Sequence, residues 1–480
     1  MFLHIIRYDW LLLRHNRTLL ASVALLALFV AFALWTGHSR IQFQEQTIAD
    51  IGRIEIESIA KNRAMVADLE RAGKPFAGNS HRDPTAPYTV ASSRGNRYIV
   101  KQPDPLAVVS VGQSDLLPYY YKLAFAKRQA LYHEEEIENA SILYNGSFDL
   151  SFVLIYLVPL LIIALTYNLV SSEREQGTMF MLMSSTASLR QIVVSKYVFR
   201  FLLLTGTFLS LTTAGLLLTG ISLYNNPEAF GFLFLLSMGY SAFWFGLSFW
   251  INSMGRNSGF NAAKLVGIWL VLGLLMPTVL DVVVSAMHPM PSRIDLIAET
   301  REASDKVTKE GDQKMAQYYG DHPELLPKGK PVDYKDFAIG RVRSTLAVEA
   351  AIRPLEAEFE TQYRNQQQLI STYRLLSPMV FMQQSLNDLA GTGDEQFRAF
   401  QTEVSRQHEG YRDFFAGKIF QQERFKATDY DTIPAFRYVA PKSILFAPAN
   451  IINLVCLFML TSLFIGFGLS RIPKIRLATA

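Results

Sequence analysis

The chain has very little cysteine and little charge for its length. Cys456 is the only cysteine among 480 residues, and it lies inside an apolar run. A single thiol excludes an internal disulfide and any zinc site built from several cysteines. Charged residues make up 18% of the sequence, against about 25% in an average soluble domain. Half of the residues are hydrophobic, so the composition predicts a membrane protein with a sizeable water-exposed portion.

The sequence also lacks the short motifs of common catalytic and nucleotide-binding sites. It contains no Gly-x-x-x-x-Gly-Lys-Ser/Thr phosphate loop, so we do not expect the chain to bind ATP for hydrolysis. It contains no His-Glu-x-x-His and no Gly-x-Ser-x-Gly. The net charge of +4 is small and indicates no nucleic-acid partner. We therefore expect a chain that is not an enzyme and binds no cofactor or metal of its own.

Six apolar runs are each long enough to cross a bilayer as a helix, which needs about 20 residues. They lie at about 18–36, 150–170, 198–223, 229–251, 264–287 and 449–469. In residues 1–17, apolar side chains such as Trp10 gather near one face, although Asp9 interrupts that face. The pattern predicts an interfacial helix against the inner leaflet. The fold class that we expect is an all-α polytopic membrane protein with six transmembrane helices and this N-terminal helix.

Two long polar blocks separate the first two spans and the last two. The first block, 38–150, opens with a helical pattern from Ile41 to Ala72, which Gly73 ends. It continues with a short strand at Tyr98–Val100 and a helix at about 119–145. The second block, 288–446, predicts helices at 293–319, 336–375, 378–390 and 394–425, with a break or kink at Pro354. The chain thus divides into 1–37, 38–150, 151–287, 288–446 and 447–480.

The basic residues that flank the spans fall on one side if the chain crosses the membrane six times. By the positive-inside rule that side is the cytoplasm, so both termini are expected there. The two polar blocks would then be extracytoplasmic insertions. The residues that set this orientation are Arg7, Arg14, Arg17, Arg174, Arg190, Lys196, Arg256, Lys264, Arg471, Lys474 and Arg476.

A charged cluster lies between the second and third spans, at Ser171-Ser172-Glu173-Arg174-Glu175-Gln176-Gly177-Thr178. Charge at the bilayer centre costs about 3 kcal/mol per residue, so the cluster must lie at a membrane face. Gly177 can adopt backbone angles closed to other residues, and Thr178 can cap the short apolar helix that follows. Ser188, with Gln191 three residues later, has the pattern of a capping box at the start of the next span.

This pattern resembles the coupling helix of ABC-2 type transporter permeases, in which a Glu-Arg-Glu-x-Gly-Thr cluster follows the second span. In that family a short helix docks into a cleft on a separate ATPase subunit, and an elbow helix precedes the first span. Ser188 and Lys196 follow at the expected distances, whereas Thr186 stands where a proline is common. The resemblance implies a coupling helix at about 171–187. The ATPase-coupling residues that it implies are Glu173, Arg174, Glu175, Gly177, Thr178, Phe180 and Leu182.

The second polar block resembles that of a subgroup of bacterial ABC-2 permeases with a large extracytoplasmic insertion between spans five and six, usually described as a domain of unknown function. The subgroup is related to the permease that serves maturation of nitrous oxide reductase. The resemblance implies a non-catalytic permease subunit of the bacterial inner membrane. Its partners would be an ATPase that binds ATP and Mg, a second permease copy or paralogue, and a periplasmic protein. The matching segments are Leu376-Ser377-Pro378, Gln383-Gln384, Asp388-Leu389-Ala390-Gly391-Thr392, Phe397, Phe400 and Tyr411.

Few polar side chains in or beside the spans are candidates for a transport pathway. Asp281 is the only carboxylate well inside a predicted span, and an intramembrane ionisable group is a functional candidate by default. A structural hydrogen bond would explain it equally well. Met287, His288 and Met290, at the outer mouth of span five, carry groups that suit Cu(I). Methionine is also ordinary interfacial filler, so packed or solvated side chains are the simpler interpretation.

Two other classes of function stay open beside the transporter. A membrane sensor or scaffold with a ligand-binding outer domain is the main alternative, although the cytoplasmic portions are short for an output domain. An intramembrane enzyme would need paired catalytic residues in the spans, and the sequence lacks them. An adjacent ATPase gene would favour a transporter, and an adjacent regulator gene would favour a sensor. In a transporter, Pro159 and Pro277 are candidate flexion points of their spans.

Overall fold

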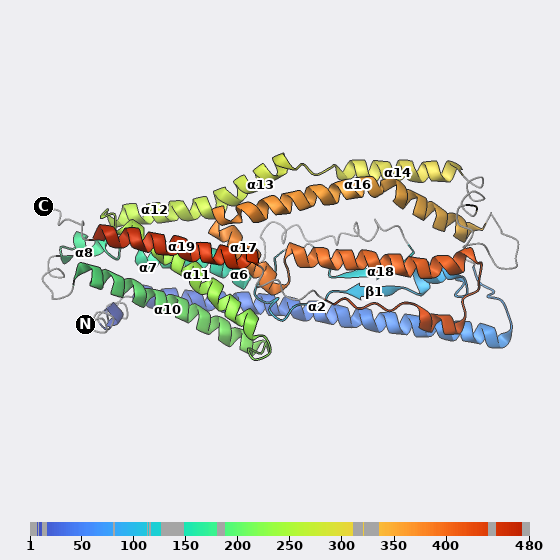
Figure 1. The fold of residues 1–480 in the computed structure, drawn as a ribbon. Coiled ribbons are helices and arrows are strands. Elements are labelled where there is room, and N and C mark those ends of the chain that lie inside the picture. Colours follow the sequence, from blue (N-terminus) through green and yellow to red (C-terminus); the bar gives the residue numbers. More distant parts are fainter. Residues whose placement is uncertain are drawn as a thin grey trace.

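A computed structural model describes residues 7, 9–11, 17–79, 82–112, 114, 117–125, 148–179, 188–310, 320, 336–439 and 448–472. In this part of the chain six helices are long and apolar enough to cross a membrane, and they coincide with the six predicted spans. The molecule is elongated, with the spans gathered at one end and the polar blocks at the other (Figure 1). By length and composition, these helices are those of a membrane protein.

The helix α2 (Arg17–Ala72) runs from the span bundle into the polar blocks at the other end of the molecule (Figure 1). It has 56 residues and is therefore about 84 Å long, against the roughly 30 Å of a bilayer core. The sequence predicted a span and a separate helix, but α2 is continuous through residues 37–38. Gly37 lies where the helix passes the backbone of Val108, and a Cβ atom there would lie 2.5 Å from the Val108 carbonyl oxygen. Gly73, with φ of +59°, ends the helix as predicted.

The other spans pack around α11 (Pro227–Asn252), which contacts four of them. Its most apolar stretch is 72% buried, whereas that of Ser258–Met287 is 6% buried and lies at the edge of the bundle. The spans in contact with α11 are represented by α7 (Val158–Thr166), α10 (Leu189–Leu218), α12 (Ser258–Leu270) and α19 (Pro448–Arg471).

Two spans contain a π-helical turn before a proline. Span two is formed by α6 (Leu150–Phe152), η3 (Val153–Leu157) and α7, and Pro159 follows η3 by two residues. Span five is formed by α12, η4 (Val271–Leu275) and α13 (Met276–Met287), and Pro277 follows η4 by two residues. Proline cannot donate a backbone hydrogen bond and clashes with the preceding turn. The wider π turn accommodates it, so the predicted departures from regular helix are present at both prolines.

The two polar blocks form one domain with a shared hydrophobic core, which we call the outer domain because it lies beyond one end of the span bundle (Figure 1). The first block contributes the far half of α2, α3 (Pro87–Thr89), η2 (Val90–Arg94), β1 (Arg97–Val100) and β2 (Tyr120–Leu123). The second contributes α14 (Arg293–Glu310), α16 (Phe337–Tyr373), η6 (Arg374–Leu376), α17 (Pro378–Ala390), α18 (Asp394–Phe420) and η7 (Ala427–Thr432). The core joins Val66, Val90, Ile99 and Leu123 to Ile339, Phe400, Tyr411 and Phe415, among others. The two blocks therefore pack against each other through this core.

One predicted helix is wrong at its start. The sequence favoured a helix from about residue 119, but β2 forms there and pairs antiparallel with β1, with Tyr98 opposite Lys122. Tyr121 and Leu123 are buried while Lys122 between them is exposed, which is the two-residue alternation of a strand. Tyrosine also favours strands, and here this local preference prevails over the helical pattern. The remainder of the predicted helix, 126–145, lies outside the described residues.

Helices of the second block follow the predicted pattern closely. The observed α14, α17 and α18 begin within a residue of the predicted starts, and α18 ends at Phe420. The helix α16 continues through Pro354, where a break or a kink was expected, and its ribbon bends along its length (Figure 1). The hydrophobic period thus located these helices correctly.

Candidate functional site

The charged turn lies at the end of the span bundle that is farthest from the outer domain (Figure 1). Span two ends at Thr166, and α8 (Ser171–Glu175) follows after one turn. Gly177 has φ of +73°, a conformation that is costly for residues with a Cβ atom. A Cβ atom there would meet nothing within 4 Å, so glycine is required for backbone conformation alone. The special backbone conformation expected at Gly177 is therefore confirmed.

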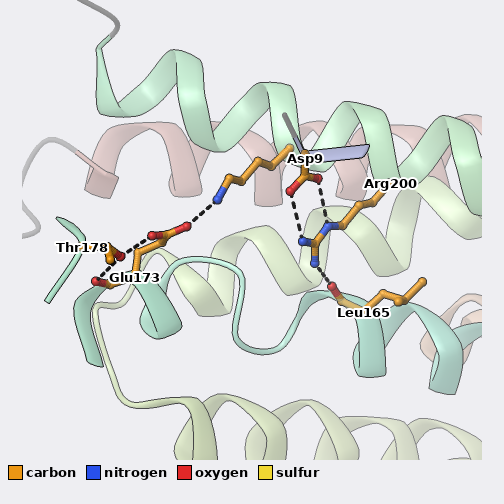
Figure 2. A network of polar contacts seen from close by, with 6 residues as sticks. Asp9, Leu165, Glu173, Thr178 and Arg200 are labelled. Atoms are coloured by element: carbon orange, nitrogen blue, oxygen red, sulfur yellow. Dashed lines mark hydrogen bonds and ion pairs between the residues drawn. The ribbon is translucent and has the colours of Figure 1, made fainter. Parts of the chain in front are cut away.

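Glu173 ties the turn to the third span. One of its carboxylate oxygens accepts a hydrogen bond from Lys196 Nζ at 2.7 Å, and the other accepts from the Thr178 hydroxyl (Figure 2). The Thr178 hydroxyl also lies 3.1 Å from the Glu173 carbonyl oxygen. The Lys196 side chain is 9% exposed and that of Glu173 is 22% exposed. This ion pair is therefore largely shielded from water and holds α8 against α10.

The next two charges tie the turn to the loop between α11 and α12. Arg174 Nη1 donates to the carbonyl oxygen of Gly255. Glu175 accepts from the backbone N–H of Ser258 at 2.6 Å and from its hydroxyl at 2.8 Å. The Ser171 hydroxyl lies 2.7 Å from that of Ser258. The turn is thus bonded to the third span on one side and to the fourth and fifth spans on the other.

Arg200 forms a second polar contact one turn further along α10. Its Nε and Nη2 atoms lie 3.4 Å from the two carboxylate oxygens of Asp9, and its Nη1 atom donates to the Leu165 carbonyl (Figure 2). Asp9 is 1% exposed. Trp10 packs edge-to-face on Phe199, with ring centroids 6.3 Å apart. Asp9, which interrupted the apolar face in the sequence, therefore anchors the N-terminal segment to the third span.

Three successive carbonyl groups at the end of span two each receive a side chain from a different span. A helix leaves its last carbonyls without partners, and a buried one must be satisfied from elsewhere. Leu165 is served by Arg200, Thr166 by Asn252 at 3.0 Å, and Tyr167 by Asn261 at 3.3 Å. These donors come from α10, α11 and α12, so the end of span two is fixed to all three.

The structure describes some of the predicted coupling residues, which bond within the chain, and leaves others outside the described residues. Glu173, Arg174 and Glu175 were expected to pair with charges on another protein, but all three bond within the chain. The Thr178 hydroxyl bonds backwards to Glu173, whereas the helix it was expected to cap falls in 180–187, outside the described residues. Phe180 and Leu182 lie there too. Met179, directly before them, is 4% exposed and packs in the span core. The capping box of Ser188 and Gln191 is confirmed.

The sequence did not single out Arg200, Asn252, Asn261 and Ser258 as part of this site. Their signal was available, because an arginine within an apolar span and asparagines beside a span end need partners. What the sequence could not supply was the identity of those partners. Their contacts with the charged turn and the end of span two join residues that are 35 to 94 positions apart, and Arg200 and Asp9 are 191 positions apart.

The other predicted candidates lie away from the charged turn. Asp281 is exposed on α13, which is near the outer domain rather than near α8 (Figure 1). Met287 and Met290 are 59% and 40% exposed. The His288 carbonyl accepts a hydrogen bond from Gln366 at 2.6 Å, which joins span five to α16. Among the described residues, no three His, Cys, Asp or Glu side chains gather in a way that could hold a metal ion.

A second polar cluster joins the outer domain to the spans through α17. The Ser377 hydroxyl donates to the Leu272 carbonyl, in the π turn of span five, at 2.8 Å. Gln383 Nε2 lies 3.3 Å from the hydroxyl of Ser151, at the start of span two. The Ser110 hydroxyl donates to Asn387 Oδ1 at 2.7 Å. The helix α17 therefore contacts both spans that contain a π turn, and also the loop of the first polar block.

The turn from α17 to α18 packs closely against the first polar block. Gly391 ends α17 with φ of +66°, and its carbonyl accepts from Lys101 Nζ at 2.7 Å. Lys101 Nζ also lies 4.0 Å from Asp104. Burial raises the pKa of Asp104 and lowers that of Lys101, and their mutual attraction opposes both shifts. These groups line a cavity of about 40 Å³, too small for more than a water molecule or two.

Because Asp388 on α17 is partly buried, we expect the stability of the folded chain to depend on pH. Burial raises its pKa to about 6, although Asn450 and Arg374 favour the charged form. Because this pKa lies above the unfolded value of about 4, folding is favoured where Asp388 is protonated, and that contribution is lost as pH rises through 6. Asp388→Asn should therefore raise the melting temperature relative to the unmodified chain more at pH 7.5 than at pH 5. Thermal denaturation of both proteins in detergent tests this.

The control for that experiment is Asp295→Asn, which removes an exposed carboxylate on α14. It should shift the melting temperature little at either pH, because substituting an exposed surface carboxylate usually changes the free energy of unfolding by no more than about 0.5 kcal/mol. An Asp388→Asn protein whose difference from the unmodified chain is the same at both pH values would contradict the assignment.

Comparison with known proteins adds one family. Residues 293–439 match the family described as Domain of unknown function (DUF3526). The matched segment runs from the start of α14 past η7, so it covers the second block's share of the outer domain and includes α17. No curated protein and no solved structure matches the chain.

Proposed function

We propose that the chain is the permease subunit of an ABC transporter of the ABC-2 type, driven by a separate ATPase that docks at the charged turn. The observation that carries this is the bonding of Glu173, Arg174 and Glu175 to α10 and to the loop 255–258. A loose surface loop would absorb a push on the residues beyond Gly177. A turn bonded to both neighbours passes the displacement to the third, fourth and fifth spans.

The positions of the start of α2 and the end of α19 support the proposed orientation of the chain in the membrane. Six spans return the chain to its starting side, and the beginning of α2 and the end of α19 lie at the same end as α8 (Figure 1). On this proposal that end is cytoplasmic, the outer domain is extracytoplasmic, and the membrane is the bacterial inner membrane. The ATPase binds ATP and Mg, and a second permease copy or paralogue completes the translocation unit.

The outer domain would then move with the spans. Its helix α17 is bonded to the π turn of span five through Ser377 and to the start of span two through Gln383. A π turn next to proline lacks part of the regular hydrogen-bond ladder and is a common site of bending. Bending at either turn would displace α17, and through it the site that receives substrate or a periplasmic partner.

Affinity purification of the tagged chain in mild detergent tests the proposal, and a stoichiometric ATPase is the expected partner. Because Glu173 is engaged internally, the informative variant is Phe180→Asp with Leu182→Asp, which charges the expected docking segment. The matched control is Leu218→Asp, since Leu218 is 89% exposed at the far end of α10. Loss of the ATPase from the Phe180→Asp, Leu182→Asp variant but not from the Leu218→Asp control supports docking at this segment. A chain that purifies without any ATPase would favour the alternative, a sensor or scaffold with a ligand-binding outer domain.

Gly177→Val should uncouple ATP hydrolysis from motion of the permease. A β-branched residue at φ of +73° costs about 1–2 kcal/mol and shifts the turn, while the spans keep their contacts. In the purified complex we expect ATP hydrolysis to continue while the ATP-dependent change in protease sensitivity of the outer domain is lost.

Gly177→Asn is the matched control, because asparagine tolerates the left-handed conformation and should retain coupling. A Gly177→Val complex that keeps the ATP-dependent change would count against the proposed role of the turn.

A further inference from the structure

An apolar groove runs along the span bundle between α10, α11 and α19, near the end that carries α8. Its volume is about 260 Å³, and every residue that lines it is apolar apart from the hydroxyl of Tyr197. That hydroxyl points away to Ser248, at 3.3 Å. The lining residues are Val194, Tyr197, Val198, Phe201, Ala242, Phe245, Gly246, Phe249 and Ile465.

The spacing of these residues makes the groove straight and parallel to the helices. On α10 they recur at i, i+3, i+4 and i+7 from Val194, and on α11 they recur in the same way from Ala242. Seven residues of helix give a length of about 10 Å, which is about two-thirds of the 15 Å of apolar core in one leaflet. The groove therefore has the direction and the length of an acyl chain segment in a single leaflet.

The floor is closed and the rim is open. Two edge-to-face ring pairs close the floor at successive levels, Tyr197 with Phe249 at 5.1 Å and Phe201 with Phe245 at 5.5 Å between centroids. Tyr197, Phe245 and Phe249 are 4–6% exposed. Val198 and Ile465, on the rim, are 37% and 40% exposed. A chain lying in the groove would thus meet fixed walls and remain continuous with the surrounding lipid.

The mouth of the groove is cationic. Arg190 lies one helical turn before Val194, and its Nη2 atom donates to the Leu469 carbonyl, one turn after Ile465, at 3.2 Å. Arg471 ends α19 two residues later. Both arginine side chains are exposed. A guanidinium has five N–H donors, so Arg190 retains donors for a second acceptor.

We propose that this groove is a binding site for one anionic phospholipid, with an acyl chain along α10 and α11 and its phosphate at Arg190 and Arg471. Charge complementarity at the mouth selects the anionic headgroup, and the apolar walls select the chain. A helix from a second copy fits less well, because a helix about 10 Å across would occupy roughly 800 Å³ over the same length. The site goes beyond the transport proposal and requires only that the six helices cross a membrane.

Native mass spectrometry of the full chain in detergent tests the site with two probes, dioleoyl phosphatidylglycerol and dioleoyl phosphatidylcholine. We expect one phosphatidylglycerol to bind more tightly than phosphatidylcholine. A basic residue near an anionic lipid contributes about 1 kcal/mol, or about fivefold in affinity. Arg190→Gln and Arg471→Gln should each lower the preference about fivefold, and the double variant should nearly abolish it. Arg256→Gln, which removes an exposed cation elsewhere at the same end, should leave it unchanged.

A second pair of variants tests the acyl-chain part. Ala242→Phe fills the groove and should weaken binding of both lipids at least tenfold, whereas Leu202→Phe, at a 60% exposed position outside the groove, should not. If Ala242→Phe fails to fold, Val194→Phe replaces it. Equal affinity for the two lipids in the unmodified chain would overturn the proposal. So would disulfide-linked dimers of Val198→Cys in a Cys456→Ser background, since they would show that a second copy covers the groove.

Discussion

Replacing Arg200 by methionine is expected to lower the free energy of unfolding by about 3–5 kcal/mol, the usual cost of removing one partner of a buried ion pair. The Arg200 side chain is 12% exposed and that of Asp9 is 2% exposed. Without Arg200, the Asp9 carboxylate and the Leu165 carbonyl both lose their charged donor in a place that water does not reach. Denaturant titration of the chain in detergent, followed by tryptophan fluorescence, measures the loss.

The matched control is Arg364→Met. Arg364 and Glu360 form a shorter ion pair, at 2.7 Å against 3.4 Å for Arg200 and Asp9, but their side chains are 67% and 56% exposed. Exposed pairs contribute about 0–1 kcal/mol, so this substitution should be nearly silent. A double-mutant cycle with Asp9→Asn then isolates the pair itself, since the two single losses should not add. An Arg200→Met protein as stable as the Arg364→Met protein would show that Asp9 is not anchored in this way.

The sequence located the charged turn because its signals are local. Charge cannot lie in the bilayer centre, Gly177 supplies a left-handed residue, and Ser188 with Gln191 satisfies a helix start by contacts within four residues. The partners of the charges are not local. Lys196, Gly255 and Ser258 are brought to the turn by packing of three spans, so the sequence left the charges unpaired and suggested another protein as their partner.

The same holds for the fold: elements with local signals could be predicted, whereas contacts between distant residues could not. Each span was predicted from its own hydrophobicity, and the helices of the second block from their own period. The outer core, in contrast, joins Val66 and Ile99 of the first block to Phe400 and Tyr411 of the second, and no local pattern specifies which helix faces which. At residues 37–38 the chain changes from apolar to polar, a pattern that predicts a boundary between two helices, although the helix continues through it.

The two polar clusters lie at opposite ends of span two. Side chains of α10, α11 and α12 fix one end through its carbonyls, beside the charged turn, and Ser151, near the other end, contacts α17 through Gln383. Between them lies the π turn η3, whose Ile155 carbonyl accepts a hydrogen bond from Tyr240 of α11 at 2.8 Å. Span two is thus held at both ends and is irregular near the end that α17 contacts. A displacement at one end would therefore either bend span two at η3 or be transmitted to its other end.

Gly391→Ala should lower the free energy of unfolding by about 2–5 kcal/mol, for two separate reasons. The residue has φ of +66°, which costs about 1–2 kcal/mol with a side chain present. A Cβ atom there would also lie 1.5 Å from an Asp104 carboxylate oxygen, so the 101–104 segment must move, and overpacking of this kind costs about 1–3 kcal/mol. Thermal or denaturant unfolding in detergent measures the sum.

Gly73→Ala separates the two reasons, because Gly73 has φ of +59° and nothing within 4 Å of a Cβ atom. It should show the backbone cost alone. Asp104→Gly, combined with Gly391→Ala, removes the clashing side chain and should recover part of the loss. If Gly391→Ala costs no more than Gly73→Ala, the close packing of the two polar blocks at this turn is wrong. If it costs more and Asp104→Gly restores the difference, the turn after α17 is where the first block is locked to the second. Any motion passed along α17 then reaches both halves of the outer domain together.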